Sequence, residues 1–164
     1  MLTDADRRLL AAFKVPCPLS GQTARHSGGA SLPCPLCGAD CQPAGVWRPL
    51  ARRCPVWTHV QVDTTDPDWA RRKAEICGTC LGTGYVFDDT LTEGELLERL
   101  VMLGYEWDAS SHERENSLGT KVTYRPSVYV YGHGREFDRS SANLRDAILA
   151  VWVQIVKAKQ EVTA

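Results

Sequence analysis

Cys77-Gly78-Thr79-Cys80-Leu81-Gly82-Thr83-Gly84 is the stretch that decides the fold of the first half, and Cys34-Pro35-Leu36-Cys37-Gly38 is its expected counterpart. A Cys-x-x-Cys turn aims two sulfurs at one point, and a tetrahedral zinc ion takes four such ligands. One pair fills half of that coordination shell, so two pairs in one chain predict a shared site. The predicted Zn²⁺ ligands are Cys34, Cys37, Cys77 and Cys80.

The residues that follow each pair favour a metal-binding turn that leads into a strand. Gly38 follows the first pair, and Gly82 and Gly84 follow the second. Glycine readily adopts the positive φ that tight turns of this kind require. The segment 85–87, Tyr-Val-Phe, has the aromatic and β-branched character of a strand. The order of turns and strands predicts a zinc-ribbon-like module over residues 34–87.

Other interpretations use the same cysteines. A thiol redox enzyme would use Cys77 and Cys80 as its reactive pair, usually at the start of a helix. Glycines at positions 82 and 84 disfavour a helix there. Four buried thiols without metal are a further alternative. A zinc deaminase is excluded, because His26 is not followed by the glutamate that such a site needs.

The stretch Cys77–Gly84 reads Cys-x-x-Cys-x-Gly-x-Gly. It resembles one repeat of the cysteine-rich region of DnaJ-type co-chaperones, which carries four such repeats. The resemblance implies zinc ligation by Cys77 and Cys80. It does not imply a co-chaperone role, because the J-domain tripeptide His-Pro-Asp is absent from the chain.

Composition excludes several classes of protein. The chain has 164 residues, 19 basic and 20 acidic, so no global field draws it to nucleic acid or to a membrane. Seven cysteines cannot all pair as disulfides, and close cysteine pairs favour metal binding in a reducing compartment. The charged start lacks an apolar signal core, and no apolar run is long enough to span a membrane. We therefore expect a cytoplasmic protein.

Residues 1–33 are expected to form a short helix, capped by Thr3 or Asp4 and ending near Phe13, and a loop. Within the zinc module, Trp47 and the alternating residues 56–62 have strand character. Residues 66–73 are expected to form a helical turn.

A capping box of Thr92 and Glu95 predicts the start of a helix in the second half, and Gly104 predicts its end. A second helix is predicted over 141–159, from an apolar stripe at helical spacing. That stripe is Leu144, Ile148, Val151, Trp152 and Ile155. Between the helices we predict strands at 105–109, 121–125 and 128–131, a polar turn at 110–119 and a turn at 132–134.

The resulting fold class is α+β: the zinc-ribbon-like module followed by a small α-β-β(β)-α sandwich over residues 91–159. This second half resembles the phage ABA-sandwich domain in its helix ending in Gly-Tyr, its strands, its glycine-rich turn and its last amphipathic helix. The resemblance implies a phage or prophage setting and a fold, without catalytic residues. The topology also resembles the double-stranded RNA-binding domain, but Arg139 and Arg145 without lysines would grip phosphate weakly.

The remaining residues raise smaller questions. Cys17, Cys41 and Cys54, with His26 or His59, lack a diagnostic spacing, so we expect buried thiols there. Trp107, Tyr129 and Trp152 are expected in the core, and His133 in an exposed turn. The basic clusters are Arg48, Arg52, Arg53, Arg71, Arg72 and Lys73, and we interpret them as a solvated face.

These patterns predict a zinc-binding accessory protein without enzymatic activity. Zinc would be structural, and the partner would be a macromolecule of the host or phage, most simply a protein. The alternatives are a zinc-ribbon nucleic-acid binder that uses the basic clusters, and a thiol redox enzyme.

Overall fold

The computed structural model describes residues 2–19, 34, 36, 45–56, 77–110, 113–115, 119, 121–123 and 125–163. Helices combine there with small antiparallel sheets, so the predicted α+β class is confirmed. The chain divides into two compact units, which we describe separately. Met1–Leu10 with Asp89–Ala164 form the sandwich unit, and Ala11–Asp88 form the cysteine unit.

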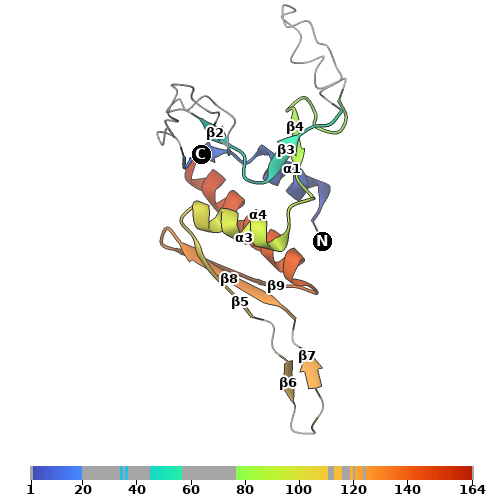
Figure 1. Cartoon of the computed structure of the whole chain (residues 1–164), viewed down its shortest axis with the longest axis vertical. Coiled ribbons are helices and arrows are strands. Elements are labelled where there is room, and N and C mark those ends of the chain that lie inside the picture. Colours follow the sequence, from blue (N-terminus) through green and yellow to red (C-terminus); the bar gives the residue numbers. More distant parts are fainter. Residues whose placement is uncertain are drawn as a thin grey trace, which may run out of the picture. The chain divides into compact units, whose positions relative to one another are not determined.

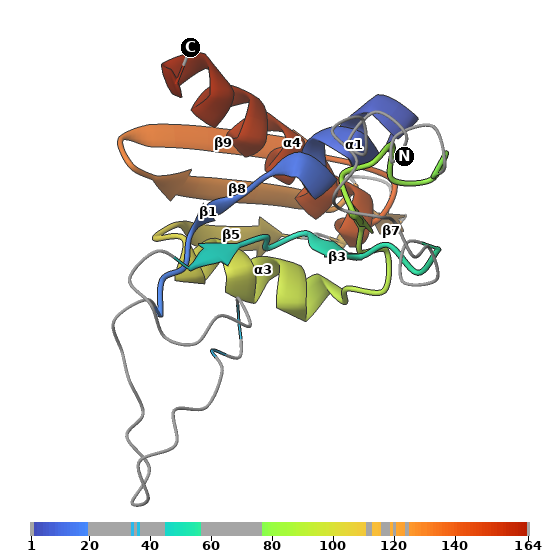
Figure 2. The same cartoon turned by 90° about the horizontal axis from the view of Figure 1, so that it is seen from above.

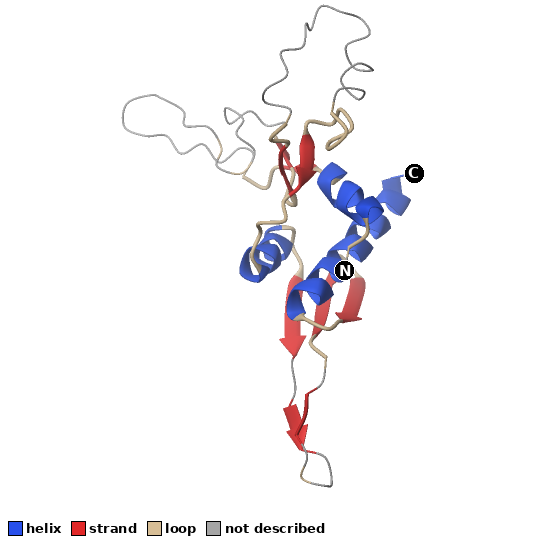
Figure 3. Cartoon of the chain, turned by 90° about the vertical axis from the view of Figure 1, so that its right-hand side faces the viewer, coloured by secondary structure: helices blue, strands red, loops and turns tan. Residues whose placement is uncertain are grey.

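The sandwich unit is built on an antiparallel sheet in the order β5 (Glu106–Ser110), β8 (Ser127–Gly132), β9 (Arg135–Ser140). Helices α3 (Glu93–Met102) and α4 (Leu144–Thr163) pack on one face of it (Figure 1). Figure 2 shows β8 running between β9 and β5. Helix α4 contacts β8 and β9, and α3 contacts β5; Figure 3 colours all helices blue and all strands red.

Helix α3 begins and ends as its sequence predicts. The hydroxyl of Thr92 accepts a hydrogen bond from the backbone N–H of Glu95, whose carboxylate accepts one from the N–H of Thr92 in return. This reciprocal pair satisfies two donors that the helix leaves open. At the other end Gly104 takes a φ of 81°, and the N–H of Tyr105 donates to the carbonyl of Leu100. These are the marks of a Schellman motif.

The turn between β8 and β9 supports the end of α3. His133 has a φ of 54° and Gly134 a φ of 71°, the backbone of a tight hairpin turn. Nε2 of His133 lies 2.8 Å from the carbonyl oxygen of Leu103, directly after α3. His133 therefore contacts the end of α3, in addition to lying in the exposed turn that the sequence predicts. At the end of β8, a Cβ atom on Gly132 would lie 2.8 Å from a ring carbon of Tyr105.

The core lies between the sheet and the two helices. Trp152 of α4 is fully buried, and its indole N–H donates to the carbonyl of Leu96 on α3 at 3.2 Å. The predicted apolar stripe of α4 is confirmed, because Ile148, Val151 and Ile155 are also fully buried. No helix in the described part of the chain is both long enough and apolar enough to cross a membrane.

The prediction for the third strand of this sheet is wrong. We expected residues 121–125 to supply it, whereas β9 supplies it and pairs with β8 from Ser127↔Ser140 to Gly132↔Arg135. The sequence of β9 is Arg-Glu-Phe-Asp-Arg-Ser, with a single apolar residue at Phe137. It is an edge strand, and charged side chains are common at sheet edges because they discourage pairing with other chains. Its low hydrophobicity hid it from pattern analysis.

A separate hairpin replaces part of the predicted polar turn. β6 (Glu113–Glu115) falls inside the turn expected at 110–119, and it pairs with β7 (Lys121–Thr123). Glu113 lies opposite Thr123, and Glu115 lies opposite Lys121. Sequence patterns detect a strand by its apolar face, and this polar segment has none. Its strand structure comes from pairing with β7.

The described strands of the cysteine unit form two short ladders. β1 (Val15–Pro16) pairs with β2 (Val46–Trp47), and β3 (Ala51–Arg53) pairs with β4 (Tyr85–Phe87). Strand character at Trp47 and at 85–87 agrees with the sequence analysis. Of the strand expected at 56–62, only Val56 is described, and it lies in a turn. The helical turn expected at 66–73 and most of the loop expected at 18–33 lie outside the described residues.

Helix α1 (Asp4–Ala12) is capped by Thr3, whose hydroxyl accepts from the N–H of Asp6. The carboxylate of Asp6 lies 3.5 Å from Nζ of Lys157 on α4. Met1–Leu10 belong to the sandwich unit, and this contact of α1 with α4 is one of the interactions within that unit.

We predict that Thr92→Ala lowers the free energy of unfolding of the protein by about 1 kcal/mol, because the cap of α3 is lost. Chemical denaturation followed by far-UV circular dichroism, which reports mainly on the helices, measures this loss. Glu98→Ala, at an exposed position inside the same helix, is the control and should change stability by much less. Equal effects of both substitutions would contradict the role of the capping box.

Candidate metal centre and binding face

The turn after Cys77 is held by its own backbone. The N–H of Leu81 donates to the carbonyl of Cys77 at 2.9 Å, and the N–H of Thr83 donates to the carbonyl of Cys80 at 3.0 Å. Leu81 has a φ of 48°, and Gly82 and Gly84 have φ values of 78° and 74°. Glycine adopts such values without strain. The predicted glycine turn therefore curls the backbone around the two cysteines.

A third cysteine reaches this turn by strand pairing. Cys54 directly follows β3, whose last residue Arg53 lies opposite Tyr85 at the start of β4. The N–H of Cys54 donates to the carbonyl of Gly84 at 2.9 Å, which extends the ladder by one step. The register of β3 against β4 thus delivers Cys54 to the turn of Cys77 and Cys80.

The three sulfurs of Cys54, Cys77 and Cys80 all lie within 4.8 Å of one another. Those of Cys54 and Cys77 are 3.6 Å apart. Two sulfurs bound to one tetrahedral metal at 2.3 Å would be about 3.8 Å apart, so the spacing fits shared ligation. The cysteines are 0%, 1% and 5% exposed, and Val86 packs against them. We call this group the three-thiol cluster, and its geometry is suited to holding a metal ion.

The surroundings of the cluster favour a thiolate at one position. The backbone N–H of Cys80 donates to the sulfur of Cys77 and is the main reason why the pKa of Cys77 falls to about 7. Burial raises the pKa of Cys80, with a further contribution from its hydrogen bond to Cys77. One negative charge is therefore available near neutral pH, and a bound cation would promote loss of the next proton.

The structure rearranges the predicted ligand set. It brings Cys77 and Cys80 together with Cys54, whereas Cys34 lies beside Cys17, with 3.6 Å between their sulfurs. Cys37 lies outside the described residues. We expected Cys54 to be an ordinary buried thiol, because it belongs to no short cysteine pair. Only pairing of β3 with β4 makes it a neighbour of residues more than twenty positions away.

The predicted basic cluster is partly engaged within the chain. The guanidinium of Arg48 lies over the ring of Tyr85 at 4.3 Å, and its Nη1 is 3.5 Å from the carbonyl of Ala12. Arg52 pairs with Asp88 at 3.8 Å, and Arg53 is exposed. Arg71, Arg72 and Lys73 lie outside the described residues. Two of the three described arginines therefore have partners within the chain, which weakens the case for a phosphate-binding surface.

The sandwich unit presents a second candidate site on the sheet face that points away from the helices. In β8, Val128 and Val130 are fully buried towards the helices, while Tyr129 and Tyr131 are 38% and 40% exposed. Each tyrosine has a carboxylate opposite it on both neighbouring strands. The two rows are Glu106–Tyr131–Glu136 and Asp108–Tyr129–Asp138, and we call these six residues the acid–tyrosine face.

Hydrogen bonds tie the tyrosines to the carboxylates. The hydroxyl of Tyr131 donates to Glu106 at 2.6 Å, and this bond is the main reason why the pKa of Tyr131 is raised. A hydrogen bond with Glu136 likewise raises the pKa of Tyr129. Both tyrosines therefore stay neutral, and the face keeps the negative charge of its four carboxylates.

The arginines of β9 point to the other side of the sheet. Arg135 and Arg139 lie opposite Gly132 and Val128, on the face that the helices cover. Arg135 donates to the carbonyl of Ala158 on α4 at 3.3 Å. The alternation along β9 thus separates charge, with cations on the helix side of the sheet and anions on the acid–tyrosine face.

Sequence reasoning placed Tyr129 and Trp107 in the core, and both predictions are wrong, because Trp107 is 41% exposed and Tyr129 38%. Trp152 is in the core as predicted. A period of two was present in the sequence as Tyr-x-Tyr at 129–131 and as acidic residues two apart at 106–108 and 136–138. Only the register shows that the three patterns share one face.

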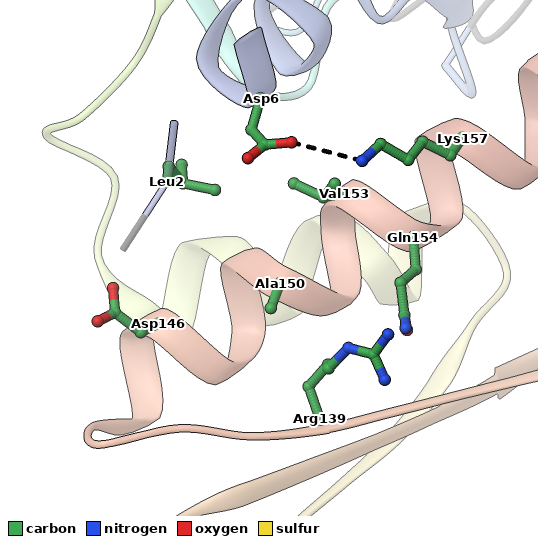
Figure 4. A pocket seen from close by; sticks show the side chains of 8 residues that line it. All are labelled: Leu2, Asp6, Arg139, Asp146, Ala150, Val153, Gln154 and Lys157. Atoms are coloured by element: carbon green, nitrogen blue, oxygen red, sulfur yellow. Dashed lines mark ion pairs between the residues drawn. The ribbon is translucent and has the colours of Figure 1, made fainter. Parts of the chain in front are cut away.

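A pocket of about 330 Å³ lies between the N-terminal segment, α4 and β9 within the sandwich unit (Figure 4). Its charged groups are engaged locally, since Asp6 pairs with Lys157, and Arg139 lies beside Gln154. The pocket is therefore lined by charged side chains that contact one another. Among these residues no group stands out as a catalytic one.

We predict that the protons released per zinc ion bound at the three-thiol cluster increase by roughly one as pH falls from about 8 to about 6. The thiolate of Cys77, with a pKa of about 7, is lost across this range, so the metal must then displace its proton. Apparent affinity should fall in step. Calorimetry in two buffers of different ionisation enthalpy measures the protons, and Cys77→Ser should remove the increment. A constant number in wild type would contradict it.

Comparison with models of protein families, with curated proteins and with solved structures found no match to this chain. The resemblances to the phage ABA-sandwich domain and to the DnaJ-type zinc repeat therefore stay predictions. The arrangement of the residues themselves is the basis for the function proposed below.

Proposed function

We propose that this protein is a zinc-stabilised, non-enzymatic binding module whose acid–tyrosine face receives a basic segment of a partner protein. The observation that carries the zinc part is the three-thiol cluster, with three sulfurs inside 4.8 Å. The binding part rests on the paired rows of tyrosine and carboxylate. The resemblance to the phage ABA-sandwich domain implies that the partner is a host or phage protein.

Zinc is the metal that this donor set favours. Thiolates are soft ligands that select zinc, copper(I) or iron–sulfur clusters over the harder cations. Zinc sites with several cysteines are usually structural and closed by four protein ligands. We propose that the fourth ligand is one of the residues outside the described part of the chain, where the sequence has Cys37, Cys41 and His59 as candidates.

A structural role agrees better with the cluster than redox chemistry does. A reactive dithiol needs an accessible thiolate, whereas Cys77 is 1% exposed. A third thiol, Cys54, lies 3.6 Å from it, which suits metal ligation. The turn after Cys80 is also no helix N-terminus, the place where reactive cysteines are commonly activated.

A basic protein segment is the partner that the chemistry of the acid–tyrosine face favours. Four carboxylates repel the phosphates of nucleic acid and attract lysine or arginine. Exposed tyrosine rings offer contact area and accept cations over their faces. Tyrosine is also enriched among the residues that dominate the energetics of protein interfaces. Nucleic-acid binding is less favoured, because Arg48 and Arg52 already have partners within the chain.

We predict that Cys77→Ser, which weakens the zinc site, removes amide protection from residues 45–54 and 77–87 while residues 144–160 keep theirs. A zinc ion that links separate segments supplies folding free energy that these short ladders lack. Hydrogen–deuterium exchange with mass spectrometry of the full chain measures both regions at once. Unchanged protection of 77–87 in the variant would contradict a structural metal.

We predict that a fluorescent oligo-arginine peptide binds wild type and loses roughly tenfold in affinity, about 1.4 kcal/mol, in Glu136→Lys/Asp138→Lys. The physical reason is the reversal of charge beside both tyrosines. The matched control is Glu93→Lys/Glu98→Lys, which makes the same change of net charge at exposed positions of α3. Fluorescence anisotropy measures both.

Equal losses in the two double variants would mean that net charge, and not this face, binds the peptide. A labelled DNA or RNA duplex in the same assay tests the alternative partner. Tight binding that falls steeply with added salt would favour nucleic acid and count against the proposal.

A further inference from the structure

The cysteine unit contains the same local arrangement twice. Cys17 directly follows β1, and its N–H donates to the carbonyl of Gly45, the residue before β2, at 2.8 Å. Cys54 directly follows β3, and its N–H donates to the carbonyl of Gly84, the residue before β4, at 2.9 Å. Each cysteine thus closes an antiparallel ladder by the same bond to a glycine.

The similarity extends to the sulfurs. The sulfurs of Cys17 and Cys34 are 3.6 Å apart, and so are those of Cys54 and Cys77. In both cases the second cysteine begins a Cys-x-x-Cys sequence that lies before the glycine. A proline follows the first cysteine each time, at positions 18 and 55. Two separated stretches of chain therefore build one geometry.

From this repeated geometry we infer that Cys17 and Cys34 are ligands of a second metal site, separate from the three-thiol cluster, and that the ion is zinc. Both cysteines are buried, at 4% and 7% exposure. Their spacing is well beyond the roughly 2.05 Å of a disulfide bond and close to the roughly 3.8 Å of two thiolates on one tetrahedral ion. Thiolate ligands favour soft metals, and zinc is one of them.

The number of cysteines agrees with two sites. A single site of four thiolates would leave three of the seven cysteines unexplained. The three-thiol cluster uses three, and Cys17 with Cys34 begins a second set. The second site thus gives a use to two of the four cysteines that the three-thiol cluster leaves over.

Native mass spectrometry of the full chain, purified with zinc in the medium, tests this inference. We expect two zinc ions in wild type, one in Cys17→Ser, one in Cys54→Ser and none in the double variant. The control is Val46→Ser, an exposed position on β2 that should keep both ions. One zinc ion that is lost only in Cys54→Ser overturns the second site and leaves the proposed function standing. One zinc ion that is lost only in Cys17→Ser supports this site and overturns the three-thiol centre.

A measurement on the unmodified chain covers the case in which Cys17→Ser fails to fold. Replacement of zinc by ¹¹³Cd gives one cadmium resonance for each occupied site. Two resonances in the range of thiolate-rich coordination are expected, and correlations from one of them to the β-protons of Cys17 and Cys34 identify it. A single resonance, coupled to Cys54 and Cys77, would overturn the second site.

Discussion

Convergence of thiols from separate segments is the constraint on which the cysteine unit depends. Its described ladders have two or three residues in each strand, too few to bury a core of their own. The bond from the N–H of Cys54 to the carbonyl of Gly84 is the point at which ladder and turn meet. A metal ion placed there would hold both in register, so that binding free energy becomes folding free energy. Chelation of the metal and loss of this part of the fold are then one event.

The sandwich unit is stabilised by different means. The core of this unit contains the fully buried side chains of Trp152, Ile148 and Ile155. Backbone and side-chain hydrogen bonds cap both ends of α3. Burial of large side chains of this kind supplies the main favourable term in folding, without a metal. The other side of the sheet is not needed for this core, which leaves it for the partner binding that we propose. Alternation along β8 gives one strand both tasks, since its valines face the helices while Tyr129 and Tyr131 face outward.

In the function that we propose, partner binding would depend on charge in the sandwich unit, and a metal would stabilise the cysteine unit. The acid–tyrosine face gathers four carboxylates in two rows, which is a fixed negative field with aromatic area inside it. Such a field steers a basic partner and opposes phosphate. The five described thiols of the cysteine unit are buried, which agrees with the structural role that we propose for them. A second zinc ion at Cys17 and Cys34 would give each of its two ladders the same support.

Sequence alone determined those features that depend on neighbours along the chain. The capping box of Thr92 and Glu95, the stop at Gly104 and the apolar stripe of α4 follow from local hydrogen bonds and from a period of 3.6 residues. The same holds for Cys77 and Cys80, which share one turn. Only the tertiary structure decided which segments meet: that Cys54 joins this pair, that Cys34 lies beside Cys17, and that β9 completes the sheet. Strand register carries no signal in composition or spacing, because a polar edge strand and a lone cysteine acquire their neighbours from pairing with distant residues.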